Sequence, residues 1–144
     1  MKFALRKSRG FTLSELIMVV AIVLVLCVFL GPFMTRTRQK FNRVLCANNL
    51  RELGLASFIY AREHKGEFPP TLEALYEEKY VSDMRLVDCP ATKSQGTLKD
   101  PEYVYAKGMT VSSPSTETLL ADKDGNHPQG RNIVKANGDI LWEK

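Results

Sequence analysis

A single carboxylate borders the most apolar part of the chain. Glu15 is followed by 20 consecutive uncharged residues, from Leu16 to Thr35, most of them Val, Leu, Ile, Phe or Met. A carboxylate at the centre of a membrane helix costs at least about 2.5 kcal/mol, and such residues usually have a function. Glu15 is therefore the first candidate functional residue. The alternative is that its side chain lies close enough to the membrane surface to reach water.

The three cysteines suggest different roles. Cys27 lies within the apolar run, where a thiol is a small apolar filler. Cys46 and Cys89 would form a disulfide if their domain lies outside the cytoplasm, and would be two free thiols otherwise. Because no histidine is clustered with them in the sequence, these two cysteines do not predict a zinc site.

A short acidic turn offers oxygen ligands at alternate positions. Asp122, Asp124 and Asn126 have the spacing found in calcium-binding loops. The segment is not an EF-hand, since Ile133 stands at the twelfth position, where that motif has a bidentate glutamate. The alternative is an ordinary turn rich in Asp, Gly and Asn. Calcium is therefore the one cofactor that the sequence raises.

No other pattern predicts catalysis or nucleic-acid binding. His64 and His127 are far apart, and Glu77 and Glu78 are expected on a solvated helix face. The net charge of +4 comes from four basic residues before Gly10, and the rest of the chain has 16 basic and 16 acidic residues. A neutral folded part does not favour a nucleic acid as a partner. We predict that the protein is not an enzyme.

The apolar run is long enough to cross a membrane. Residues 11–33 would span roughly 34 Å as a helix, against a hydrocarbon core of about 30 Å. The core helix of a soluble protein is the alternative. Gly31 and Pro32 predict a kink or a locally melted turn, because proline lacks a backbone N–H. Beyond them, apolar residues recur at helical spacing, so residues 34–64 are expected to continue the helix in amphipathic form.

Residues 65–144 predict a small globular head. Thr71 is a plausible N-cap of a short helix, and a polar loop follows. Strands are expected from Tyr103, from Thr116 and on both sides of Asn137-Gly138, a dipeptide that favours a β-hairpin. Such a sheet must bury one face, and the amphipathic half of the long helix offers the apolar stripe. The predicted fold class is α+β, a long N-terminal helix packed by a three- or four-stranded antiparallel sheet.

The start of the chain resembles a known processing signal. The stretch "GFTLSE", residues 10–15, has a basic leader before it and an apolar run after it, as in the class III signal of type IV pilins and type II secretion pseudopilins. The resemblance implies that prepilin peptidase removes residues 1–10 by cleavage after Gly10, and that the new terminus, Phe11, is N-methylated. It also implies that Glu15 neutralises the terminal ammonium in a filament. A secretory signal peptide fits less well, since its apolar region is shorter and ends at an Ala-x-Ala-like site.

Two later stretches are similar to pseudopilins of the major type. They are "CANNLRELGLASFIYAREHKGEFPPTLEALYE", from Cys46, and the closing "GRNIVKANGDILWEK". The resemblance implies a structural subunit of a pilus-like filament, first of all a type II secretion pseudopilin involved in protein secretion. A type IV pilus subunit is the nearest alternative, and a membrane-anchored periplasmic binding or enzymatic domain is a more distant one. In major pseudopilins the C-terminal part of the head carries a calcium site, which supports the calcium hypothesis.

The resemblance also implies a location and partners. The chain would cross the inner membrane once, with a cytoplasmic N-terminus before cleavage and a periplasmic head, and would then enter a filament. Its partners would be itself and other pilins or pseudopilins, the prepilin peptidase, the platform protein of the inner membrane and, indirectly, an assembly ATPase.

Overall fold

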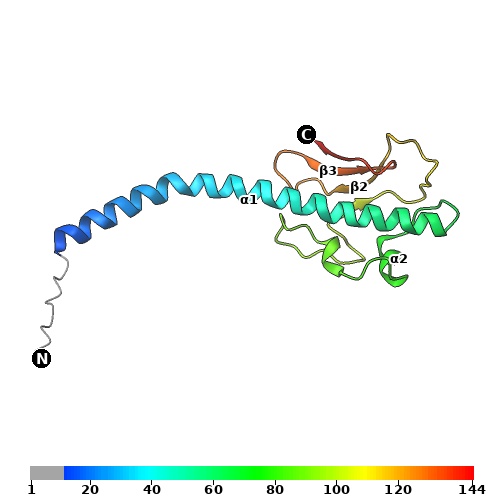
Figure 1. Ribbon diagram of the computed structural model, residues 1–144, viewed down its shortest axis with the longest axis horizontal. Coiled ribbons are helices and arrows are strands. Elements are labelled where there is room, and N and C mark those ends of the chain that lie inside the picture. Colours follow the sequence, from blue (N-terminus) through cyan, green and yellow to red (C-terminus); the bar gives the residue numbers. More distant parts are fainter. Residues whose placement is uncertain (1–11) are drawn as a thin grey trace, which may run out of the picture. The chain divides into compact units, whose positions relative to one another are not determined.

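The computed structural model describes residues 12–144 of the chain (Figure 1). The predicted cleavage and methylation positions, Gly10 and Phe11, lie outside the described residues. The first element is one α-helix of 51 residues, α1 (Leu13–Glu63). The chain divides into two compact units after Thr37, so α1 contributes to both.

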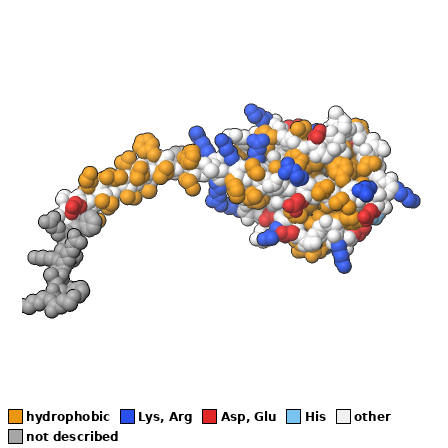
Figure 2. All heavy atoms as spheres, in the orientation of Figure 1, with side chains coloured by type: hydrophobic (Ala, Val, Ile, Leu, Met, Phe, Trp, Pro, Cys, Tyr) orange, Lys and Arg blue, Asp and Glu red, His pale blue; other side chains and the backbone are white. Residues whose placement is uncertain are grey.

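In the first unit, most of the surface of α1 is apolar. The large apolar side chains from Leu13 to Met34 are 49% to 75% exposed, and Figure 2 shows them covering the visible face of this segment. The helix is long and apolar enough to cross a membrane. This surface therefore needs lipid or other helices to cover it.

The region around the proline stays helical. The helix continues through Gly31 and Pro32, so the predicted locally melted turn is wrong. The hydroxyls of Thr35 and Thr37 donate to the backbone carbonyls of Gly31 and Phe33, at 3.3 and 3.0 Å. Such bonds often accompany a bend in a helix. A kink at Gly31-Pro32 stays a prediction.

In the second unit, α1 buries one stripe of side chains. Cys46, Leu50, Leu53 and Tyr60 recur at spacings of three to seven residues and are at most 7% exposed. This periodicity matches the 3.6-residue turn of a helix packed on one side. The helix ends where the sequence predicts, because the following residues adopt positive φ angles: 54° at Lys65 and 89° at Gly66.

Two short helices follow α1. α2 (Leu72–Glu77) begins as predicted, with the Thr71 hydroxyl accepting a hydrogen bond from the backbone N–H of Ala74 at 3.2 Å. A 3-10 helix, η1 (Met84–Val87), comes next. Its N-cap, Asp83, accepts a hydrogen bond from the backbone N–H of Arg85 at 3.0 Å.

The C-terminal part forms a four-stranded antiparallel sheet in sequential order. Its strands are β1 (Tyr103–Tyr105), β2 (Thr118–Asp122), β3 (Arg131–Lys135) and β4 (Ile140–Glu143). The hairpin predicted from Asn137-Gly138 joins β3 to β4, with Ile133 opposite Leu141. Gly138 has φ 90°, a conformation that glycine adopts without strain.

The sheet packs against the second half of α1. Leu120 of β2 and Val134 of β3 join Leu50 and Leu53 of α1 in one buried apolar cluster, and each is at most 1% exposed. Figure 1 shows β2 and β3 beside this part of the helix. The predicted α+β fold class is confirmed.

Gly54 allows the close approach of helix and sheet. Its position in a helix interior looks unfavourable from sequence, because glycine costs about 1 kcal/mol there relative to alanine. In the structure a Cβ atom at this position would lie 3.2 Å from Cγ1 of Val134. The missing side chain thus makes room for the sheet.

We expect Gly54→Val to destabilise the head by about 1 to 3 kcal/mol, because it overpacks the contact with Val134. Gly54→Ala should change stability by less than about 1 kcal/mol, since better helix propensity offsets the tighter contact. Urea denaturation of the full chain in detergent, followed by Trp142 fluorescence, measures both. Gly31→Ala is the matched control, as a Cβ there meets nothing within 4 Å. A Gly54→Val chain as stable as the unaltered one would contradict this packing role.

Candidate functional site

The first turn of α1 is closed by reciprocal hydrogen bonds. Oε2 of Glu15 accepts from the backbone N–H and from the hydroxyl of Thr12, both at 2.8 Å. The Thr12 hydroxyl oxygen in turn lies 3.3 Å from the backbone nitrogen of Glu15. This arrangement is a capping box, which satisfies N–H groups that have no partner within the helix.

The cap places a negative charge at the start of α1. The N-terminus of a helix carries a partial positive charge, which stabilises a carboxylate there. Oε2 of Glu15 has two donors, whereas a carboxylate can accept about four hydrogen bonds in total. The carboxylate therefore has capacity for a further cationic donor near the beginning of the helix.

The capping role of Glu15 has a sequence signal. The stretch "TLSE", residues 12–15, fits the pattern Ser/Thr-x-x-Glu/Gln just before an apolar run. Reading Glu15 only as a charge in an apolar segment misses that Thr12 holds it in place.

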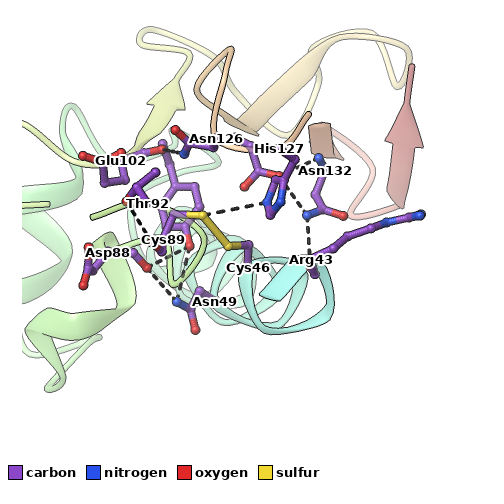
Figure 3. Close-up of polar contacts among 12 residues, drawn as sticks. Arg43, Cys46, Asn49, Asp88, Cys89, Thr92, Glu102, Asn126, His127 and Asn132 are labelled. Carbon is purple, nitrogen blue, oxygen red and sulfur yellow. Dashed lines mark hydrogen bonds and ion pairs between the residues drawn. A yellow bond between two sulfur atoms is a disulfide. The ribbon is translucent and has the colours of Figure 1, made fainter. Parts of the chain in front are cut away.

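A second group of polar side chains lies inside the head. Cys46 of α1 and Cys89, in the turn after η1, are joined in a disulfide with Cα atoms 5.6 Å apart. His127, in the loop between β2 and β3, places Nε2 3.8 Å from Sγ of Cys89 (Figure 3). His127 is 7% exposed and both cysteines are at most 1% exposed.

Asp122 and Asn132 complete this group. Oδ2 of Asp122 accepts from the backbone N–H and the side-chain amide of Asn132, at 2.7 and 2.8 Å. It also lies 3.3 Å from Nε2 of His127. Asn132 donates further to the backbone carbonyl of Arg43 at 3.2 Å, so this amide links β3 to both β2 and α1.

Burial changes the ionisation of the two titratable groups. Removal from water raises the pKa of the Asp122 carboxyl, although hydrogen bonds from Asn132 oppose the rise. Removal from water also lowers the pKa of the His127 imidazole, and the carboxyl of Asp122 opposes that change. Both shifts disfavour the charged form, as expected for groups in an apolar interior.

The predicted calcium ligands have separate partners. Asp122 points to His127 and Asn132, whereas Oδ1 of Asp124 lies 3.2 Å from the guanidinium of Arg131 on the surface. Asn126 donates its side-chain amide to the backbone carbonyl of Glu102 at 2.9 Å. A shared calcium site would need these side chains to change partners. Calcium binding there stays a prediction.

The sequence did not reveal that Asp122 and His127 lie beside the disulfide. His127 is 38 residues from Cys89 along the chain, and no spacing motif connects them. The sheet topology brings the end of β2 and the following loop to the cysteines. No histidine is near the two cysteines in the sequence, but in the folded head His127 lies beside them.

The comparisons with known proteins find one match. A model of the prokaryotic N-terminal methylation motif matches residues 5–31. No curated protein matches the chain, and no solved structure does. The motif match supports a type IV pilin-like chain, a pilus or pseudopilus subunit. It favours a structural subunit over an enzyme, and with the apolar helix it fits a membrane-anchored pilin.

We expect reduction of the disulfide to lower the free energy of unfolding by about 3 to 4 kcal/mol. A separation of 43 residues between the cysteines gives this value from the entropy that the crosslink removes from the unfolded chain. Urea denaturation of the oxidised and reduced full chain, both in EDTA, measures it. Cys27→Ser, which alters only the exposed cysteine, should leave the difference unchanged. Equal stability of the two forms would contradict the expectation.

We expect Asn132→Ala to cost about 2 to 3 kcal/mol, because a buried carboxylate loses a donor and the link from β3 to α1 is lost. Asn48→Ala is the matched control, since Asn48 is exposed on α1 and its side chain accepts a hydrogen bond from Arg51 at the surface. That change should stay within about 0.5 kcal/mol. Thermal unfolding monitored by circular dichroism compares the two. Similar losses in both variants would show that the buried amide has no special role.

Proposed function

We propose that the chain is a pseudopilin of a type II secretion system, made as a precursor and assembled through α1 into a filament. In this proposal, prepilin peptidase cleaves after Gly10 and Phe11 becomes a methylated N-terminus. The observation that carries the proposal is the carboxylate of Glu15, held at the start of an exposed apolar helix of membrane length.

The position of Glu15 suits an ion pair with the new terminus. Phe11 is four residues before Glu15 in the sequence, just ahead of the capped first turn. Cleavage would create an ammonium at the end of α1 where the cap holds the carboxylate. A buried unpaired charge is very costly, and a buried pair costs much less. Pairing within one subunit or with a neighbour would thus permit burial in a bundle of helices and fix the subunits' register.

The exposed surface of α1 suits two successive environments. While the subunit is in the inner membrane, lipid would cover the side chains from Leu13 to Met34. In the filament, the same helices of neighbouring subunits would cover them. The head would lie in the periplasm, and the platform protein and an assembly ATPase would be other chains.

A secretion pseudopilin is favoured over a type IV pilus subunit by a resemblance. The stretches from Cys46 and at the C-terminus are similar to those of major pseudopilins. The proposed work is mechanical, as filament growth would push exported proteins outward. In this proposal, Asp122, Asp124 and Asn126 would bind calcium in the head.

The deciding experiment separates the charge of Glu15 from its capping role. Glu15→Gln keeps an acceptor for Thr12 but removes the charge, because glutamine also serves in a capping box. Thr12→Val removes the hydroxyl bonds of the cap, keeps the backbone N–H bond to the carboxylate, and keeps the charge. We expect both variants to be cleaved and methylated, Thr12→Val to enter filaments, and Glu15→Gln to fail.

The measurements are intact and N-terminal peptide masses from native membranes, and the yield of sheared filaments. Ser14→Ala is the matched control, since it removes a hydroxyl that bonds the Thr12 hydroxyl at 3.1 Å but leaves both hydrogen bonds to the carboxylate. Filaments containing Glu15→Gln at the unaltered level would overturn the ion-pair role. An uncleaved Met1 terminus in cells with active prepilin peptidase would overturn the proposed function as a whole.

A further inference from the structure

Four side chains of metal-ligand type meet inside the head. They are Cys46, Cys89, Asp122 and His127, and their ligand atoms all lie within 4.8 Å of one another. All four residues are buried, and they come from α1, the turn after η1, the end of β2 and the loop before β3. Figure 3 shows the ring of His127 directed at the disulfide. We propose that, when the disulfide is reduced, these four side chains bind one Zn²⁺ ion.

The distances fit a tetrahedral zinc site. With Zn–S bonds of about 2.3 Å and Zn–N or Zn–O bonds of about 2.0 to 2.1 Å, ligand atoms stand roughly 3.3 to 3.8 Å apart. Nε2 of His127 is 3.8 Å from Sγ of Cys89 and 3.3 Å from Oδ2 of Asp122. The two sulfur atoms must separate, which breaking their bond permits, and any ligand pair near the 4.8 Å limit of the cluster must move closer.

The donor set selects the metal. Two thiolates, an imidazole and a carboxylate are ligands that zinc prefers, whereas calcium and magnesium take oxygen ligands. A site with four protein ligands is closed, as in structural zinc sites. The ion would therefore crosslink four segments of the head, where the disulfide joins two.

The carboxylate of Asp122 supports the site independently. Its Oδ1 is buried and has no hydrogen-bond partner among the described residues. A buried acceptor without a partner is unfavourable. Oδ2 is oriented by the amide groups of Asn132, as outer-shell groups orient zinc ligands. The centre thus offers an oriented carboxylate that the protein itself leaves partly unsatisfied.

The centre is close to a surface pocket. His127 forms part of the wall of this pocket, which is also lined by Asp124, Arg131 and Glu143. Because Nε2 of the same ring lies 3.8 Å from Sγ of Cys89, His127 stands between the pocket and the sulfur atoms.

The disulfide and the metal exclude each other. A dithiol reductant transfers two electrons and two protons to the Cys46–Cys89 bond and becomes a disulfide itself. Zn²⁺ then displaces the two thiol protons as two Zn–S bonds form. In the oxidised form each sulfur is bonded to the other, and neither is a thiolate. The head would thus have two alternative crosslinks at one place.

The test uses the full chain in detergent, with Cys27→Ser so that only the two thiols of the site are present. The chain is reduced with a phosphine in the absence of oxygen. It is then titrated with Co²⁺ as the probe. We expect one Co²⁺ per chain, with thiolate charge-transfer and tetrahedral ligand-field bands, and displacement by Zn²⁺. The oxidised chain should show neither band.

Ligand variants and X-ray absorption decide between four ligands and fewer. His127→Gln and Asp122→Asn should each weaken Zn²⁺ binding by a factor of about 10 to 100 or more. His64→Gln changes the other histidine and should leave binding unchanged. If the ligand variants do not fold, zinc absorption spectra of the unaltered reduced chain still count the ligands, with two sulfur and two nitrogen or oxygen atoms expected.

Several results would overturn the proposal. One is a reduced, folded chain that gives no charge-transfer band. Another is an oxidised chain that binds Co²⁺ equally well. Zinc spectra without sulfur ligands, or unchanged affinity in both ligand variants, would also exclude this site. Thermal unfolding adds a readout without spectroscopy, since Zn²⁺ should raise the melting temperature of the reduced chain and EDTA should reverse the rise.

Discussion

The apolar surface of the first half of α1 must be covered by something other than the described chain. Its large side chains from Leu13 to Met34 stay exposed, whereas the second half of the helix buries a stripe under the sheet. Lipid tails and neighbouring helices are similarly apolar, so these side chains do not distinguish strongly between the two. A charged group in the same segment does distinguish a lipid environment from a bundle of helices. Within residues 12–35, Glu15 carries the only charged side chain, so in the proposed function the move from membrane to filament would depend on that carboxylate.

The head depends on polar contacts as well as on its apolar core. The carboxylate of Asp122 is completely buried, and its main donors come from Asn132 on the neighbouring strand. The same asparagine contacts the carbonyl of Arg43, whose guanidinium lies 3.7 Å from the ring centroid of Trp142 on β4. A shift of the sheet along α1 would break these contacts together and leave buried groups unpaired. They therefore favour one register of the sheet on the helix, which a purely apolar contact would specify less strictly.

Local features could be predicted from sequence, and features that depend on packing could not. The long helix, its end at Lys65-Gly66, the Thr71 cap and the hairpin at Asn137-Gly138 each follow from residues close together in the chain. The contact of Gly54 with Val134 joins residues 80 positions apart, so from sequence the glycine looks like a defect. The same is true of His127, whose place beside the disulfide depends on how the sheet folds back on α1. The capping box of Thr12 and Glu15 differs from these missed features, because its sequence pattern is local and allows it to be recognised.

Glu15 can serve two purposes because they use different properties of one side chain. In the membrane, the cap and the helix dipole offset part of the cost of the carboxylate, the dipole contributing about 0.3 to 1 kcal/mol and up to about 2 in a partly buried position. That is less than the cost of at least about 2.5 kcal/mol near the centre of a bilayer, but the start of α1 is at one end of the span. Thr12 is a neutral donor, however, so the cap leaves the net charge unchanged. Inside a dry bundle of helices that charge needs a cation, and in the proposed mature chain the terminal ammonium would be four residues away along the sequence. The cap would thus determine where the charge lies. The ammonium would determine whether that charge can be buried.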